Sequence, residues 1–150
     1  MHTFPMYKLS YSPNSYYVEI ALDNDGLLQF MELLRSKKGK LCFPLSNTTS
    51  DMISLRCLEV IPVPKEIFSG TDYHIMCLYD LESSTVQFHF DEDGFTEMQY
   101  ILNFIHETGD HFHMFADFDL FVGKEKTEEV SIIRAVTIYL PEEPICQSSQ

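Results

Sequence analysis

The stretch VEIALDNDGLLQFMELL (residues 18–34) decides the expected fold, because VQFHFDEDGFTEMQYIL (residues 86–102) repeats its pattern. Five of the seventeen positions are identical, and most of the others keep an apolar residue opposite an apolar residue. In each copy apolar and polar residues first alternate, which predicts a half-buried strand. Apolar residues then recur every three or four positions, which predicts a helix with one buried face.

The motif Asp-x-Asp-Gly stands at the junction of strand and helix in both copies, and we interpret it as a helix corner. Asp23 and Asp91, or the aspartates two positions later, can accept hydrogen bonds from the free N–H groups of the first helical turn. A calcium loop is the rival interpretation, but an EF-hand needs glycine at position 6 and glutamate at position 12. With glycine at position 6 the loops would begin at Ala21 and His89, which cannot supply the first acidic ligand.

The segments around the two copies also correspond, and each half of the chain reads β-β-α-β-β. The further expected strands are residues 7–11, 39–45 and 55–64 in the first half, and 73–79, 109–115 and 132–141 in the second. We therefore expect an α+β fold, in which two such units, related by a pseudo-two-fold axis, form a mainly antiparallel sheet with two helices on one face. Residues 1–150 form a single domain in this interpretation, with units at about 6–65 and 72–143 and a flexible tail at 144–150.

Charge is distributed unevenly along the chain. The net charge is −13; residues 1–70 carry 7 basic and 7 acidic side chains, whereas residues 71–150 carry 3 and 16. An acidic surface repels nucleic acid and membranes and attracts basic proteins. We therefore expect the partner surface in the acidic second half, where acids and aromatic residues alternate in one loop. The candidate partner-binding residues are Asp117, Phe118, Asp119, Phe121, Glu125, Glu128 and Glu129.

The sequence gives little support to catalysis or to a bound cofactor. It contains no Gly-x-Ser-x-Gly, P-loop or Gly-x-Gly-x-x-Gly motif. His111 and His113 lie two apart in an expected strand, and with His89 on a neighbouring strand they could bind zinc or iron. A partly solvated histidine pair is the simpler interpretation, so we expect no enzyme activity and no cofactor.

Composition indicates a cytoplasmic protein. No apolar run approaches the roughly 18 residues that span a bilayer, and the first residues resemble no signal peptide. The four cysteines, Cys42, Cys57, Cys77 and Cys146, form no Cys-x-x-Cys pair. We expect them to be small apolar residues of the core or tail in a reducing compartment.

The second unit resembles a small immunity-protein family of bacterial polymorphic toxin systems, and residues 18–64 form a degenerate first copy. The matching residues are Asp91, Asp93, Gly94, the helix at 95–105, Gly109, Asp110, His111, His113 and the strand at 132–140. The resemblance implies a protein that neutralises a toxin by occluding it. The acidic charge favours a basic toxin, a nuclease among the candidates, and we expect the protein to act as a monomer or homodimer. Two other functions remain open: a metal-dependent enzyme or metal-binding domain that uses the three histidines, and a non-catalytic scaffold or ligand-binding domain.

Overall fold

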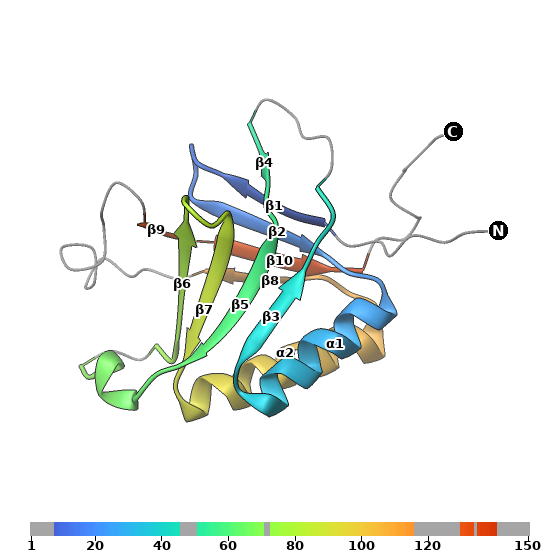
Figure 1. Ribbon diagram of the computed structural model, residues 1–150. Helices are drawn as coiled ribbons and strands as arrows, with labels where there is room; N and C mark the ends of the chain where they lie inside the picture. The colour runs from blue at the N-terminus through green and yellow to red at the C-terminus, as the bar shows by residue number, and fades with distance from the viewer. Residues whose placement is uncertain (1–7, 46–50, 71–72, 116–129, 134, 141–150) are drawn as a thin grey trace.

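The computed structural model describes residues 8–45, 51–70, 73–115, 130–133 and 135–140. Within these ranges the chain forms two strands, a helix and three strands, and after a short 3-10 helix it forms the same series again (Figure 1). The expected tail at 144–150 lies outside the described residues. In chain order the elements are β1 (Lys8–Ser12), β2 (Tyr17–Ala21), α1 (Asn24–Ser36), β3 (Gly39–Cys42), β4 (Ile53–Ser54), β5 (Cys57–Pro62), η1 (Lys65–Phe68), β6 (Ile75–Asp80), β7 (Thr85–Phe90), α2 (Glu92–Thr108), β8 (Phe112–Phe115), β9 (Val130–Ile132) and β10 (Ala135–Tyr139).

The strands form two five-stranded sheets, and each sheet takes strands from both halves of the chain. Sheet A has the order β4-β1-β2-β10-β8, and sheet B has the order β9-β6-β7-β5-β3. The two orders match when each strand is replaced by its counterpart in the other half. Strand β2 pairs with β10, and β5 pairs with β7, in parallel; the other neighbours are antiparallel.

The expected α+β class is confirmed, with mainly antiparallel sheet and both helices side by side on one side of the molecule (Figure 1). Two features were not expected. The short strands β4 and β9 extend the predicted β-β-α-β-β series and pair with the hairpin of their own half. The other two strands after each helix, β3 and β5 or β8 and β10, join the hairpin of the other half. The pseudo-two-fold relation between the two units stays a prediction, although residues 18–34 and 86–102 both form a strand, a corner and a helix.

One apolar core is shared by the two sheets and the two helices. Along β2, Val18 and Ile20 are fully buried while Glu19 between them is half-exposed, as the alternating pattern predicts. The sheets meet directly where the rings of Tyr11 on β1 and Tyr79 on β6 stack, with their centroids 4.3 Å apart. Because each buried large apolar side chain contributes about 1.5–3 kcal/mol, this shared core is the main source of stability.

The helices dock on the same core through aromatic side chains that come from the repeated motif. Phe30 on α1 lies against Phe88 on β7, with ring centroids 6.1 Å apart. Phe95 on α2 lies 4.9 Å from Phe90 on the same strand. The buried face of each helix therefore fixes its position beside the strands.

Both helices begin at the first aspartate of Asp-x-Asp-Gly. The Asp23 carboxylate accepts a hydrogen bond from the Gly26 N–H at 2.7 Å, and the Asp91 carboxylate accepts one from the Gly94 N–H at 2.8 Å. The second aspartates, Asp25 and Asp93, lie in the first helical turn, where a negative charge complements the positive end of the helix dipole. The motif is thus a repeated helix cap, and the structure selects between the two predicted capping positions.

Glycine in the second copy is needed because another segment of backbone approaches closely. A Cβ atom on Gly94 would lie 2.1 Å from the carbonyl oxygen of His74, just before β6. Gly94 lies within α2 and, because it has no side chain, leaves space for the chain that enters β6.

The capping aspartate of the second half also holds a histidine. Asp91 is 3% exposed, and its other carboxylate oxygen lies 2.9 Å from Nδ1 of His74. This hydrogen bond raises the pKa of His74 above its usual value. Burial opposes the increase with a smaller effect, and the charge of Asp91 adds to it. Asp91 therefore joins the start of β6 to the start of α2.

The cysteines differ in their surroundings. Cys77 is buried, as expected for a small apolar core residue, but Cys42 is exposed and Cys57 is half-buried. These two lie on the outer face of sheet B, because their strand neighbours Leu41 and Leu58 point into the core. The fourth cysteine, Cys146, is outside the described residues.

Replacing either capping aspartate should destabilise the fold. We expect Asp23→Ala to lower the free energy of unfolding by about 0.5–2 kcal/mol, and Asp91→Ala to lower it further because Asp91 is buried and also binds His74. Urea denaturation measures both losses. Asp25→Ala and Asp93→Ala are matched controls and should cost less; a larger loss in these controls would contradict the assignment of the caps. Added calcium should leave the melting temperature unchanged.

The His74–Asp91 contact should make stability depend on pH. Because folding raises the pKa of His74, its contribution is fully present below the unfolded value of about 6.5 and is lost as pH rises through the folded value. We expect the stability difference between the wild type and His74→Gln to shrink as pH rises above about 6.5. Comparison with the variant is essential, since burial lowers the pKa of His89 and gives the opposite dependence on pH. A difference that is constant or grows with pH would contradict this account.

Candidate functional site

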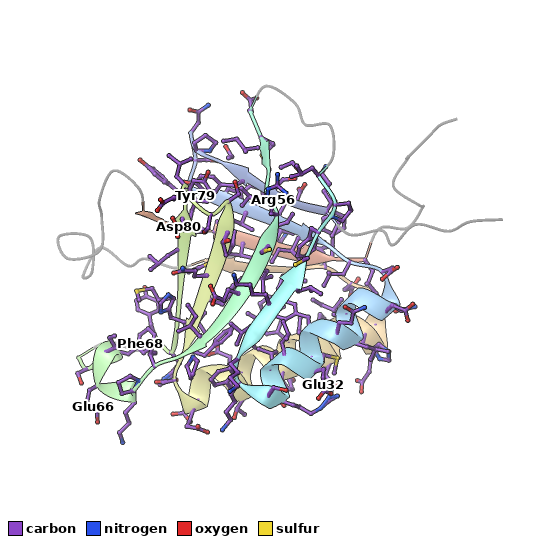
Figure 2. The ribbon with its side chains drawn as sticks, in the orientation of Figure 1. Glu32, Arg56, Glu66, Phe68, Tyr79 and Asp80 are labelled. Carbon is purple, nitrogen blue, oxygen red and sulfur yellow. The ribbon has the colours of Figure 1, made fainter. Side chains whose placement is uncertain are left out.

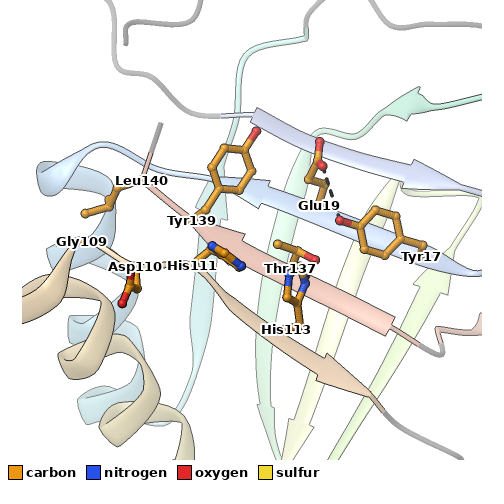
Figure 3. Close-up of a pocket in the computed structure, with 9 residues that line it drawn as sticks. All are labelled: Tyr17, Glu19, Gly109, Asp110, His111, His113, Thr137, Tyr139 and Leu140. Carbon is orange, nitrogen blue, oxygen red and sulfur yellow. Dashed lines mark hydrogen bonds between the residues drawn. The ribbon is translucent and has the colours of Figure 1, made fainter. Parts of the chain in front are cut away.

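A cavity of about 580 Å³ opens on the outer face of sheet A, beside the C-terminal end of α2 (Figure 3). Its walls come from both halves of the chain, because β2 belongs to the first half and β8 and β10 to the second. The residues that line it are Tyr17 and Glu19 from β2, Thr137 and Tyr139 from β10, His113 from β8, and Gly109, Asp110, His111 and Leu140 from the adjoining segments.

Strand register brings the polar side chains of this cavity together. Glu19 on β2 is paired with Thr137 on β10, and Thr137 is paired with His113 on β8, so the three form a row across the sheet. Their strand neighbours Val18 and Val136 are buried in the core. The alternation that builds the core therefore also presents this row on the outer face.

The cavity combines a carboxylate with aromatic and imidazole rings. The Tyr17 hydroxyl donates to Oε2 of Glu19 at 3.4 Å, as the dashed line in Figure 3 shows. Nδ1 of His113 lies 2.7 Å from the Thr137 hydroxyl, and the rings of His111 and His113 are 4.6 Å apart and nearly perpendicular. Among the described residues, no lysine or arginine forms an ion pair with Glu19.

Two tyrosines show the electrostatic character of the cavity. Burial raises the pKa of Tyr139, and the negative charge of Glu19 raises it further. Burial also raises the pKa of Tyr17; a hydrogen bond with Thr137 partly opposes this effect, and Glu19 adds to it. Burial is the larger cause of both shifts, and the negative charge of Glu19 adds to each. That charge favours a positively charged ligand group.

A second feature is the solvent-exposed face of α2. Asp93, Glu97, Tyr100, Phe104 and Glu107 follow one another at intervals of four, three, four and three residues, so they line one side of the helix. All five are exposed, Tyr100 by 76% and Phe104 by 36%. We call these five residues the α2 face; it carries three carboxylates around two aromatic side chains.

The α2 face and the cavity adjoin at the end of the helix. Glu107 lies in the last turn of α2, and Gly109, Asp110 and His111 follow it into the cavity wall. The ring of Phe104 meets Phe112, the first residue of β8, edge-on with centroids 6.4 Å apart. Acidic and aromatic groups therefore continue from one surface to the other.

Only some of the candidate site residues named from the sequence lie in the described part of the chain. His111 and His113 do lie together, in the cavity, but His89 is on β7 in sheet B, where it contacts Gln87. The three histidines of the alternative metal site are thus divided between two sheets, and the described ranges contain no group of three or more potential metal ligands. The expected partner-binding residues lie outside the described residues: Asp117, Phe118, Asp119, Phe121, Glu125, Glu128 and Glu129.

Glu19, Thr137 and Tyr139 are not recognisable as a group in the sequence, because their proximity depends on the parallel contact between β2 and β10. No local pattern predicts that contact. The α2 face could have been predicted from the sequence. The helical spacing that identifies the buried side of residues 95–105 also identifies the opposite, exposed side.

Comparisons with known protein families, with characterised proteins and with solved structures found no match. The resemblance to immunity proteins therefore stays a prediction. In the part of the chain that the structure describes, neither helix has the length and apolar character needed to cross a membrane.

Replacing the carboxylate of the cavity should change the titration of its two tyrosines. Because Glu19 raises the pKa of both Tyr17 and Tyr139, we expect Glu19→Gln to lower both values. NMR titration of labelled tyrosine rings measures them separately. Tyr79 is the internal control, since burial and Asp80 raise its pKa and it should not respond. Unchanged values for Tyr17 and Tyr139 would contradict the described geometry.

Proposed function

We propose that the protein is a cytoplasmic immunity protein that binds a basic protein toxin and neutralises it by occlusion, without catalysis and without a cofactor. The observation that carries the proposal is the α2 face, where exposed aromatic side chains lie among carboxylates on a helix held firmly by the core. The concentration of negative charge in the second half of the chain supports it.

The α2 face has the composition expected of a surface that binds a basic partner. Large exposed aromatic side chains are rare on monomer surfaces and common at the centres of interfaces, where they contribute most of the binding energy. Tyr100 supplies such an anchor, and Phe104 lies one turn further along the helix. Asp93, Glu97 and Glu107 would speed the encounter with a positively charged surface.

The cavity offers a second contact for the same partner. Glu19 lies between the rings of Tyr17 and Tyr139 (Figure 3). A lysine or arginine side chain of the toxin could pair there with the carboxylate while it packs on an aromatic ring. Toxins that act on nucleic acids carry such side chains at their phosphate-binding sites. Blocking those side chains would prevent substrate binding.

The acidic loop predicted from sequence would extend this surface. Asp117, Asp119, Glu128 and Glu129 add four carboxylates to the second half, and Phe118 and Phe121 add apolar groups. Their inclusion in the interface rests on composition and on the position of the loop directly after β8.

Co-expression with the product of the adjacent gene tests the proposal. We expect that product to be toxic and this protein to restore growth and form a stable complex with it. The test variant Glu97→Lys/Glu107→Lys should slow association by about tenfold or more and weaken its salt dependence. Tyr100→Ala should weaken binding by about 30-fold or more.

The matched control reverses two exposed glutamates of the first half, Glu32 on α1 and Glu66 on η1, both labelled in Figure 2. Glu32→Lys/Glu66→Lys makes the same change in net charge and should leave association nearly unchanged. If the control variant lost protection as fully as the α2 variant, the interface assignment would be wrong. A neighbouring product that is not toxic, or toxicity that this protein does not relieve, would contradict the immunity function itself.

A further inference from the structure

Two cysteines from different strands face each other on the outer surface of sheet B. Cys42 on β3 and Cys57 on β5 are direct partners in the antiparallel register, and their Sγ atoms are 3.4 Å apart. Cys42 is exposed and Cys57 is half-buried. Within the described residues, β3 lies at the edge of sheet B and pairs with β5 alone, so reagents can approach the pair from solvent.

The backbone at this pair has the spacing that a disulfide requires. The neighbouring residues Phe43 and Arg56 share the ladder hydrogen bond, from the Phe43 N–H to the Arg56 carbonyl at 2.8 Å. The N–H of Cys57 points the other way, towards the Ser84 carbonyl next to β7. Cys42 and Cys57 therefore form a non-hydrogen-bonded pair, where Cα atoms are about 4.5 Å apart, within the range that disulfides bridge.

The surroundings give the two thiols different roles. Burial, the hydrogen bond with Cys42 and the charge of Cys42 raise the pKa of Cys57, while Lys40 and Arg56 oppose this increase. Cys57 is thus held as a thiol beside the more accessible Cys42. Lys40 and Arg56 also supply positive charge to an outer face that an anionic thiol reagent would approach.

We propose that Cys42 is a site of thiol–disulfide exchange with glutathione disulfide and that Cys57 resolves the product into an intramolecular disulfide. The Cys42 thiolate attacks one sulfur of glutathione disulfide, forms a mixed disulfide and releases one glutathione thiolate. Cys57 then loses its proton and attacks Cys42 Sγ, which releases the second glutathione. In total, two protein thiols are oxidised, one glutathione disulfide is reduced to two glutathione molecules, and reduced glutathione reverses the reaction.

The Cys42–Cys57 disulfide would link the edge strand β3 covalently to its neighbour β5. The bridge joins two residues that are 15 positions apart in the chain, with β4 between them, and it links β3 to β5 at the end of β3. Because such a closure restricts mainly the unfolded chain, the oxidised protein should melt about 5–10 °C above the reduced protein. A thiol pair of this kind is compatible with a reducing cytoplasm, where disulfides are transient and report on oxidation.

The test treats the reduced full-length protein with glutathione disulfide and follows it by intact mass and peptide mapping. Cys146→Ser is the background, so that this thiol cannot pair with the other two. We expect a product that lacks two hydrogen atoms, contains a Cys42–Cys57 cross-linked peptide and melts at the higher temperature. In Cys57→Ser, a stable glutathione adduct should accumulate on Cys42.

The matched variant Cys42→Ser should react at Cys57 at least about tenfold more slowly than Cys57→Ser reacts at Cys42. Circular dichroism of both variants checks that a slow reaction does not reflect unfolding. A glutathione adduct that persists on Cys42 in the presence of Cys57 would overturn the resolving role. Absence of any modification at Cys42, or a faster reaction at Cys57 than at Cys42, would overturn the proposal as a whole.

Discussion

The parallel pairing of β2 with β10 and of β5 with β7 is the constraint on which the rest of the structure depends. Each contact joins the hairpin of one half to two strands of the other half, which are β10 and β8 in sheet A and β5 and β3 in sheet B. As a result, neither sheet can be completed by one half alone. The stacked rings of Tyr11 and Tyr79 and the side-by-side helices close a single core between these sheets. A small acidic chain thereby gains a firmly held framework despite the mutual repulsion of its charges.

The proposed binding surface is a consequence of the same exchange of strands. Glu19 belongs to the first half, whereas Thr137, Tyr139 and His113 belong to the second, and only the β2–β10 contact places them in one cavity. The position of the α2 face depends on the N-terminal cap of α2, where the Asp91 carboxylate forms hydrogen bonds with the Gly94 N–H and with His74. In the first half the positions that correspond to Tyr100 and Phe104 are Glu32 and Ser36, so the two similar units differ at the proposed binding surface.

The features that could be predicted from the sequence are those that depend on residues close together in the chain. Strand, corner and helix in residues 18–34 and 86–102 were predictable because alternation, helical spacing and capping act within a few residues. The choice of Asp23 and Asp91 over the later aspartates required the backbone geometry, since both spacings suit a cap. Strand exchange could not be predicted, because apolar strands with the same alternation can pair in several orders. The cavity and the Cys42–Cys57 pair depend on that order and were missed with it.

The most direct test of this arrangement is the pattern of NMR contacts between backbone protons of neighbouring strands in the intact monomer. Exchanged strands predict contacts between Val18 and Val136 and between Leu58 and Val86. If each half instead completed its own sheet, Val18 would lie beside Leu58 and Val86 beside Val136. Observation of the first pair of contacts would establish the shared framework on which the cavity depends, and observation of the second pair would contradict it.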